Sequence, residues 1–297
     1  MITTEIKQTT ISKPVSLSGV GLHTGQKVEL TFMPAKADNG YTFTRVDLDG
    51  NPIIEANINF VTSTQRGTVL EKNGVTIQTC EHVLAALVGL EIDNVNIELN
   101  ASEPPIIDGS SKYFVEALES AGKVDLDHFR EEYVVKNVIS YKDEKSGSEI
   151  TIIPSDHYEV TTMVDFGTKI LGTQNATLNN LEDFKNEISN SRTFSFLHEI
   201  EMLLNEGLIK GGDLNNAIVY VDKELSKSTM EKLKIAFNKN DIKVKSNGIL
   251  DNLTLHYPNE AARHKLLDVI GDLALAGVRL RGCLLYTSPS PRDVEES

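Results

Sequence analysis

Residues 259–276 read NEAARHKLLDVIGDLALA and predict one amphipathic helix, Asn259–Ala276, around which the rest of the fold can be arranged. Five apolar residues recur at helical spacing and mark its buried face: Ala262, Leu266, Val269, Ile270 and Leu273. His264, Asp268 and Asp272 follow one another at intervals of four residues, so they share a separate stripe about 80° wide at 100° per residue. This segment therefore predicts a helix with an apolar face and a distinct polar stripe.

The polar stripe has two interpretations. An imidazole and a carboxylate one helical turn apart can bind the same metal ion, as they do in other zinc-binding helices. The same spacing is also typical of a solvated helix face, on which such side chains pair with one another. Taken alone, the stripe favours the solvated face.

A second segment places a carboxylate directly before an imidazole. Residues 79–82 read TCEH and begin a predicted helix, Thr79–Leu90, for which Thr79 is a suitable N-cap. In such a pair His82 can bind a metal ion while Glu81 accepts the proton of a water molecule. The alternative, which the pair alone favours, is an ordinary helix start with Glu81 near the positive end of the dipole. Combined with the stripe, two imidazoles and one carboxylate make a three-ligand set with an open fourth position, the arrangement of hydrolytic zinc.

The composition predicts a globular protein of about two domains, at roughly 100–200 residues per domain. Of its 297 residues, 40% are apolar and 24% are charged, which is ordinary for soluble proteins. No stretch approaches the roughly 20 apolar residues that span a bilayer, and Met1–Pro14 does not resemble a signal peptide, so we expect a cytoplasmic protein without stable membrane insertion. Two cysteines, Cys80 and Cys283, fit a reducing compartment. The net charge of −14 argues against nucleic-acid binding.

The order of predicted elements repeats once along the chain. In each half strands precede helices, and Phe194–Glu206 is among the helices predicted in the second half. This order predicts the α+β class, with two similar layers that each have a mixed sheet and helices on one face. A polar connection, Gly122–Glu132, separates predicted domains 1–124 and 130–283. Residues 284–297, LLYTSPSPRDVEES, lack periodicity and are predicted to be disordered or foreign to the domain.

Five motifs stand in order along the chain: Gly19–Gly25 (GVGLHTG), Thr79–His82 (TCEH), Asp108–Ser111 (DGSS), Ser191–Phe194 (SRTF) and Arg263–Leu273 (RHKLLDVIGDL). This series resembles the UDP-3-O-acyl-N-acetylglucosamine deacetylases, the zinc enzymes that commit bacterial cells to lipid A synthesis. The resemblance runs from Ile2 to Gly282, and its last motif is long enough to be specific. It implies two β/α sandwich domains packed helix to helix, with the active site at their interface.

The same resemblance implies the site residues. His82, His264 and Asp268 would bind zinc, and Glu81 would be the general base. Four further roles follow: oxyanion stabilisation by Thr193, a positive charge beside the substrate from Lys265, packing on the substrate by Phe194, and orientation of a general-acid histidine by Asp272. An inserted element within Phe166–Asn190 and Gly207–Asn216 would form an apolar passage for the acyl chain.

The implied reaction is hydrolysis of the N-acetyl amide of UDP-3-O-acyl-N-acetylglucosamine. In the family the general acid is a histidine of a Gly-His pair, which lies beyond the glycine that matches Gly282. This chain has no histidine after His264, and Pro291 stands where the family has the general-acid histidine. We therefore expect residues 284–297 to reflect a truncation or a junction, with impaired activity and without the dehydratase fused in some members. Two alternatives stay open: a catalytically silent metal-binding relative, and a zinc hydrolase of small amides.

Overall fold

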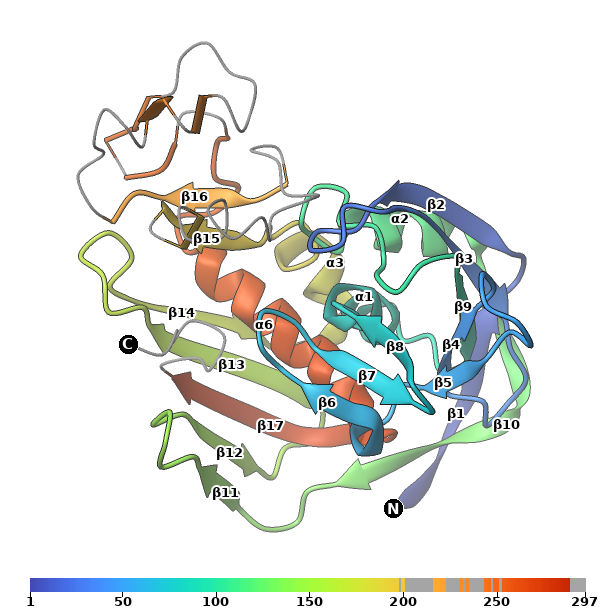
Figure 1. Ribbon diagram of the computed structural model, residues 1–297. Helices are drawn as coiled ribbons and strands as arrows, with labels where there is room; N and C mark the ends of the chain where they lie inside the picture. The colour runs from blue at the N-terminus through green and yellow to red at the C-terminus, as the bar shows by residue number, and fades with distance from the viewer. Residues whose placement is uncertain are drawn as a thin grey trace.

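The computed structural model describes residues 1–197, 199–200, 216–222, 230–231, 233–234, 243–246, 248–250 and 253–288. Mixed β-sheets and a few helices make up this part of the chain, which confirms the predicted α+β class (Figure 1). Within these residues we find no helix with the length and apolar character needed to cross a bilayer.

A five-stranded sheet forms in the first half. Its spatial order is β2 (Val15–Val20), β3 (Lys27–Pro34), β9 (Val95–Leu99), β4 (Tyr41–Arg45) and β5 (Ile53–Glu55). Neighbours are antiparallel except β4 and β9, which are parallel. Alternate residues of β3 point into the core, so Phe32 meets Phe114 of helix α2 (Lys112–Ala121) edge to face, with ring centroids 6.4 Å apart.

Smaller elements complete the first half. A three-stranded sheet contains β6 (Val61–Ser63), β7 (Val69–Lys72) and β8 (Val75–Gln78), and a short 3₁₀ helix, η1 (Ile58–Phe60), precedes it. Helix α1 (Glu81–Gly89) follows β8 and is buried along its whole length. Its start differs from the prediction, because Cys80 and not Thr79 is the N-cap residue, and no side chain caps the helix.

The larger sheet has seven strands. A path runs through β1 (Ile2–Ile11), β10 (Lys123–Val134), β17 (Arg279–Ser288), β12 (Glu149–Ile153) and β11 (Ile139–Lys142), and β17 also pairs with β13 (Tyr158–Asp165), which pairs with β14 (Thr173–Leu178). Helix α6 (Glu260–Leu273) lies across one face of this sheet (Figure 1), where the Thr162 hydroxyl donates to the carbonyl of Ala262 at 3.2 Å. Among the described residues the other short elements are η2 (Leu181–Asp183), α3 (Phe184–Glu187), β15 (Phe194–Phe196), β16 (Ile218–Tyr220) and η3 (Ala274–Ala276).

Two expectations about the chain's connections are wrong. All but the first residue of the polar connection predicted at Gly122–Glu132 lies in strand β10, which pairs with β1 and so brings the first strand of the chain into the sheet of the second half. Disorder predicted from Leu284 onward is wrong for Leu284–Ser288, which lie in β17 between β12 and β13. In this stretch Leu284 and Tyr286 are buried while Leu285 and Thr287 are only partly buried, and β12 and β13 supply a pairing partner at each edge. Residues 289–297 lie outside the described part.

Leu284 provides a direct test of this strand, because its side chain is 1% exposed within the main core. We expect Leu284→Ala to lower the free energy of unfolding by about 2–5 kcal/mol, since the substitution leaves a cavity in a packed site. Leu48→Ala is the control, because Leu48 is exposed and the same truncation there should change stability by only about 0.5 kcal/mol. Urea titrations at matched metal content measure the stability of both variants. A midpoint for Leu284→Ala equal to that of the wild type would show that Leu284 does not pack in this core.

Helices α1 and α6 cross in close contact. A Cβ atom on Gly271 would lie only 2.1 Å from the backbone oxygen of Glu81, so only glycine permits this separation of the two helices. On either side of the crossing the helices bury apolar side chains such as Leu84 and Ile270, which are both fully shielded from solvent. The crossing therefore brings the start of α1 beside the polar stripe of α6.

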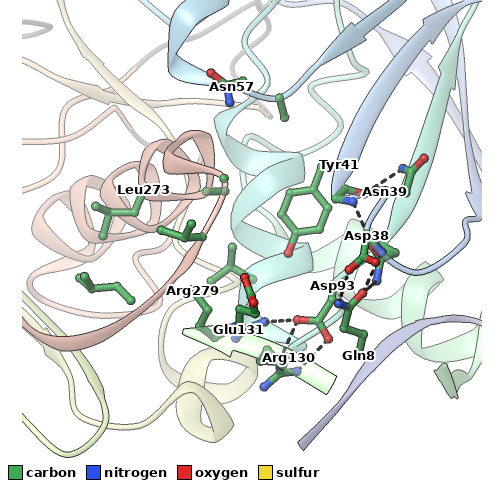
Figure 2. A pocket seen from close by; sticks show the side chains of 18 of the residues that line it. Gln8, Asp38, Asn39, Tyr41, Asn57, Asp93, Arg130, Glu131, Leu273 and Arg279 are labelled. Carbon is green, nitrogen blue, oxygen red and sulfur yellow. Dashed lines mark hydrogen bonds and ion pairs between the residues drawn. The ribbon is translucent and has the colours of Figure 1, made fainter. Parts of the chain in front are cut away.

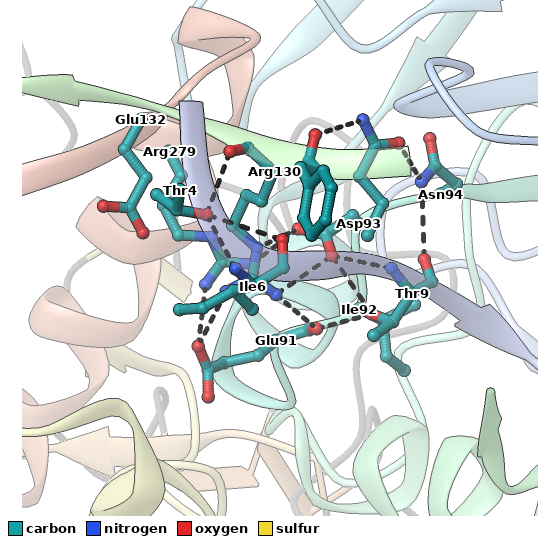
Figure 3. A network of polar contacts seen from close by, with 12 residues as sticks. Thr4, Ile6, Thr9, Glu91, Ile92, Asp93, Asn94, Arg130, Glu132 and Arg279 are labelled. Atoms are coloured by element: carbon teal, nitrogen blue, oxygen red, sulfur yellow. Dashed lines mark hydrogen bonds and ion pairs between the residues drawn. The ribbon is translucent and has the colours of Figure 1, made fainter. Parts of the chain in front are cut away.

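A largely buried ionic network fixes the other end of α1 to the large sheet (Figure 3). Arg130 of β10 donates through Nε and Nη2 to the two carboxylate oxygens of Asp93, each at 2.9 Å, and Arg279 of β17 donates to Asp93 Oδ1 at 3.2 Å. Asp93 also accepts from the backbone N–H of Thr9 at 2.9 Å. Because removal of one partner from a buried pair leaves an uncompensated charge, this network holds the loop between α1 and β9 firmly against β1, β10 and β17.

Candidate metal centre and active site

Three predicted metal ligands meet where α1 and α6 cross. His82 comes from α1, and His264 and Asp268 come from α6 one turn apart; one donor atom of each lies within 4.8 Å of the others. Asp268 Oδ1 is 3.5 Å from His82 Nε2 and 3.6 Å from His264 Nε2. All three residues are buried, with exposed fractions of 6%, 2% and 6%. The solvated-face interpretation of the stripe is therefore wrong for His264 and Asp268, because α1 covers them.

The His264 ring is held in one orientation and one tautomer. Its Nδ1 is 3.0 Å from the carbonyl oxygen of Ser191, and because a carbonyl can only accept, Nδ1 carries the proton. The lone pair of the neutral ring then lies on Nε2, on the side of Asp268 and His82. Burial lowers the pKa of His264 to about 4, so the ring is neutral near pH 7. Sequence reasoning did not identify Ser191 as this partner, since the hydrogen bond is made by its backbone.

His82 is held separately. Its ring packs edge to face against that of His264, with centroids 4.9 Å apart, and its backbone carbonyl accepts a 2.7 Å hydrogen bond from the buried Ser111 hydroxyl. Ser111 belongs to the Asp108–Ser111 motif, which forms a turn before α2. The motif thus supports the first residues of α1 from the side.

The donor set fits a zinc ion. Two imidazoles and a carboxylate are ligands that zinc accepts, and donors about 2.0–2.1 Å from a tetrahedral ion lie roughly 3.3–3.4 Å apart. The 3.5 and 3.6 Å separations from Asp268 Oδ1 to the two rings are close to that spacing. A protonated His264 Nδ1 bound to a carbonyl is also the usual support for a histidine that ligates through Nε2. Neither cysteine, Cys80 or Cys283, belongs to this cluster.

Glu81 precedes His82 but directs its carboxylate to a different partner. Glu81 is 3% exposed, and its Oε2 accepts a hydrogen bond from the backbone N–H of Thr68 at 3.1 Å. The Thr68 hydroxyl donates at 2.7 Å to Oδ1 of Asp272, the last residue of the polar stripe. Thr68 therefore joins the two acidic residues that flank the metal ligands. Sequence reasoning missed Thr68, because nothing in its local pattern marks it.

Two more of the predicted residues, Lys265 and Phe194, border the cluster. Lys265 Nζ is 3.8 Å from Asp268 Oδ2 and 5.4 Å from the centre of the Phe194 ring, and that ring lies 6.4 Å from the His264 ring. Thr193 is fixed through its backbone, with its N–H 2.7 Å from the carbonyl of Gly109. The helix predicted from Phe194 is wrong at its start, because Phe194–Phe196 form β15 and pair in parallel with β16. Alternating aromatic residues pack well on a strand, and this preference prevails there.

An apolar cluster adjoins Phe194. Phe166 packs edge to face on Phe194 at 5.4 Å, and a group of buried residues continues from it: Val164, Leu171, Phe196, Ile218, Tyr220, Ile249 and Ala261. Phe166 and Leu171 belong to the first segment that was expected to form an acyl passage. Of the second segment, Gly207–Asn216, only Asn216 is among the described residues.

A separate cavity of about 450 Å³ lies beside the C-terminal end of α6, at Leu273 (Figure 2). Tyr41, Arg130, Leu273 and Arg279 are among the residues that line it, so it borders the buried ionic network. No predicted ligand, base or substrate residue lines this cavity. The cavity and the His/His/Asp cluster are therefore different places in the fold.

Comparisons with known proteins agree on one family. The sequence profile described as UDP-3-O-acyl N-acetylglycosamine deacetylase matches residues 8–234 and 228–290, which extends the resemblance beyond Gly282 and agrees with the length of β17. The bifunctional enzyme LpxC/FabZ of Bacteroides thetaiotaomicron is 44% identical over 96% of this chain and 62% of its own length. The protein of the same name from Porphyromonas gingivalis is 42% identical over 95% of the chain and 61% of its own length.

A relative that is named only as a deacetylase, and not as a bifunctional enzyme, is covered over more of its length. The UDP-3-O-acyl-N-acetylglucosamine deacetylase of Geotalea uraniireducens is 37% identical over 93% of this chain and 81% of its own length. Against the bifunctional relatives, the chain spans about 62% of their length. The similarity thus covers nearly all of this chain in both kinds of relative.

Proposed function

Since this chain belongs to the UDP-3-O-acyl-N-acetylglucosamine deacetylase family, we propose that it hydrolyses the N-acetyl amide of UDP-3-O-acyl-N-acetylglucosamine and releases acetate. The convergence of His82, His264 and Asp268 beside Glu81 carries the proposal. A buried carboxylate next to a metal-binding cluster is the arrangement that hydrolytic zinc enzymes use. We propose that the reaction takes place in the cytoplasm, as the first committed step of lipid A synthesis.

The three converging residues would hold the zinc ion. When bound there, zinc supplies Lewis acidity that polarises the amide carbonyl and lowers the pKa of a water molecule. The Ser191 carbonyl keeps His264 in the tautomer that presents Nε2, and Ser111 keeps the backbone of His82 in place. Both supports act before substrate arrives, so the ligands need little reorganisation.

Glu81 would be the general base. Its carboxylate accepts the proton of the attacking water. The hydrogen bond from the Thr68 N–H to Oε2 fixes the orientation of the carboxylate, and with it the direction in which Oε1 points. Burial helps here, because a carboxylate in a water-poor site interacts strongly with the groups it faces. The departing amine then needs a proton. Among the 297 residues there is no histidine after His264, so we propose that protonated Glu81 returns the proton and that this chain turns over slowly.

Three further residues would act on the substrate. Lys265 and Thr193 would stabilise the negative charge that develops on the amide oxygen, and Phe194 would pack on the sugar and the start of the acyl chain. The position of Lys265 Nζ over the Phe194 ring, 3.8 Å from Asp268, supports a cationic group at the edge of the cluster. Asp272, fixed by Thr68, would orient a general-acid histidine where one is present.

We propose that the chain works as two units, predicted from the sequence as 1–124 and 130–283, packed through α1 and α6 with the site between them. Strand β1 and residues Leu284–Ser288 of β17 belong to the sheet of the second unit. The first unit contributes Glu81 and His82, and the second contributes His264 and Asp268. The apolar cluster beside Phe194 would receive the acyl chain. The bifunctional names of two relatives support a dehydratase as the partner activity of such chains.

Turnover of two substrates tests the proposal. Zinc-loaded protein is expected to release acetate from UDP-3-O-acyl-N-acetylglucosamine at least about 100-fold faster, in kcat/KM, than from UDP-N-acetylglucosamine, because binding of the remote acyl chain contributes to the transition state. Acetate release at equal rates would indicate a hydrolase of small amides. Zinc binding without hydrolysis of either compound would indicate a catalytically silent relative.

A further inference from the structure

Thr79 has an unusual backbone just before α1. Its φ is +56°, in the left-handed region that β-branched residues rarely occupy, and it lies two residues before Glu81. The sequence predicts that Thr79 caps α1, but the helix has Cys80 at the N-cap and no side-chain cap. Unfavourable backbone geometry persists only where surrounding contacts enforce it, and it is common at functional sites.

The contact that holds Thr79 is a buried carboxylate. Its hydroxyl donates to Oε1 of Glu103 at 3.1 Å, and Glu103 is fully shielded from solvent. Glu103 accepts from three more donors: the His23 N–H, shared between its two oxygens at 3.1 Å each, and the N–H and hydroxyl of Thr24 at 3.0 and 2.9 Å. A buried carboxylate is costly unless such donors satisfy it, so these four donors fix Glu103 in place. Gly21 permits the approach, because a Cβ there would lie 2.5 Å from Oε2.

A continuous series of hydrogen bonds leads from Glu103 to the base. The Thr79 N–H donates to the Thr68 carbonyl at 2.9 Å, and the Thr68 N–H donates to Oε2 of Glu81 at 3.1 Å. The same Thr68 bonds to Asp272 of α6 through its hydroxyl. Displacement of Thr79 would therefore move Thr68, and with it the group that orients the Glu81 carboxylate.

We propose that Glu103 is a positioning residue for the general base, and that it acts through the hydroxyl of Thr79. The catalytic consequence rests on the proposed function. His82 has its own support from Ser111, so the Glu103–Thr79 contact governs the direction of the Glu81 carboxylate and leaves the metal ligands in place. The Gly19–Gly25 motif gains a role as well, because it supplies the donors that hold Glu103.

Thr79→Val tests the proposal, because it keeps the volume and the β-branch and replaces the hydroxyl by a methyl group that cannot donate to Glu103. We expect kcat to fall about 10- to 100-fold, as for a small misplacement of a catalytic group, with KM and zinc content unchanged. Thr79→Ser restores the hydroxyl and should recover most of kcat. Thr76→Val makes the same chemical change three residues earlier, on β8, and should leave all values unchanged. Wild-type kcat in Thr79→Val, or failure of serine to rescue it, would overturn the proposal.

Hydrogen exchange provides a readout that does not depend on activity. In zinc-loaded Thr79→Val the Thr68 amide is expected to exchange faster than in the wild type, because its bond to Glu81 loosens, while Thr76→Val exchanges normally. Unchanged exchange of the Thr68 amide in Thr79→Val would contradict the proposal, even if no deacetylation is detected. Faster exchange in Thr79→Val together with no turnover by the wild type would count against the proposed function alone. If Thr79→Val does not fold, Glu103→Gln serves instead, because the amide of glutamine cannot accept from all four donors. A kcat and a Thr68 exchange rate equal to those of the wild type in Glu103→Gln would overturn the proposal.

Discussion

Replacement of His264 by alanine is expected to abolish tight zinc binding. The free energy with which proteins bind structural zinc is about 10–16 kcal/mol, so one ligand of several accounts for about 3–4 kcal/mol, or roughly a 10²- to 10³-fold weaker Kd. His264 is 2% exposed and its Nε2 lies 3.6 Å from Asp268, so no water-exposed group can take its place without rearrangement. Competition with a chromophoric chelator measures the Kd, and metal analysis gives the zinc content.

The thermal response to a chelator provides the matching control. Wild-type protein bound to zinc should lose several degrees in Tm when the metal is removed, because a ligand that binds only the native state stabilises it by mass action. His264→Ala should show little change on chelation. His128→Ala removes an exposed imidazole from β10 and should retain the wild-type response. Undiminished zinc affinity in His264→Ala would mean that the His/His/Asp cluster is not the metal site.

The helix Asn259–Ala276 could be predicted closely because all of its information is local. The apolar period of α6 and its polar stripe are both properties of one continuous segment, and the structure has the helix at Glu260–Leu273 with η3 after it. Whether the stripe faces solvent or another helix could not be settled locally. Burial of His264 depends on α1, which lies about 180 residues earlier, and on Gly271, whose lack of a side chain permits the crossing.

Strand β17 shows the opposite case. Its buried residues Gly282–Leu284 and Tyr286 alternate too little to indicate a strand, and Ser and Pro residues follow directly. What makes these residues a strand is the pairing with β12 and β13, which supply hydrogen bonds on both edges. Composition alone suggested a tail, because the partners lie more than 100 residues away.

The contacts that support the site could not be predicted from the sequence, although Ser111 belongs to the Asp108–Ser111 motif. Thr68, Ser111 and Glu103 each contact a site segment through a hydrogen bond that joins distant positions, and two of these bonds involve the backbone. Motif spacing identifies residues that share an element, as for His264 and Asp268. Residues that orient a catalytic group from another element have no such spacing, so the structure was needed to find them.

Glu81→Gln is expected to retain zinc and to lose about 10²- to 10⁴-fold in kcat, the range for removal of a general base. Glutamine keeps the shape of the side chain, and its oxygen can still accept from the Thr68 N–H, so the start of α1 should not move. An amide cannot take up the proton of water near pH 7. Because Glu81 is also proposed to return the proton to the amine in this chain, the loss should fall toward the upper end of that range.

Two measurements on this variant separate the possible roles of Glu81. Zinc content and Kd should equal those of the wild type, because the converging donor atoms belong to His82, His264 and Asp268. Glu116→Gln makes the same change on the exposed surface of α2 and should leave kcat unaltered. Loss of zinc in Glu81→Gln would identify Glu81 as a zinc ligand beside His82. Retained zinc together with wild-type kcat would instead show that another residue is the general base. The hydrogen bond from Thr68 to Glu81 would then only stabilise the start of α1.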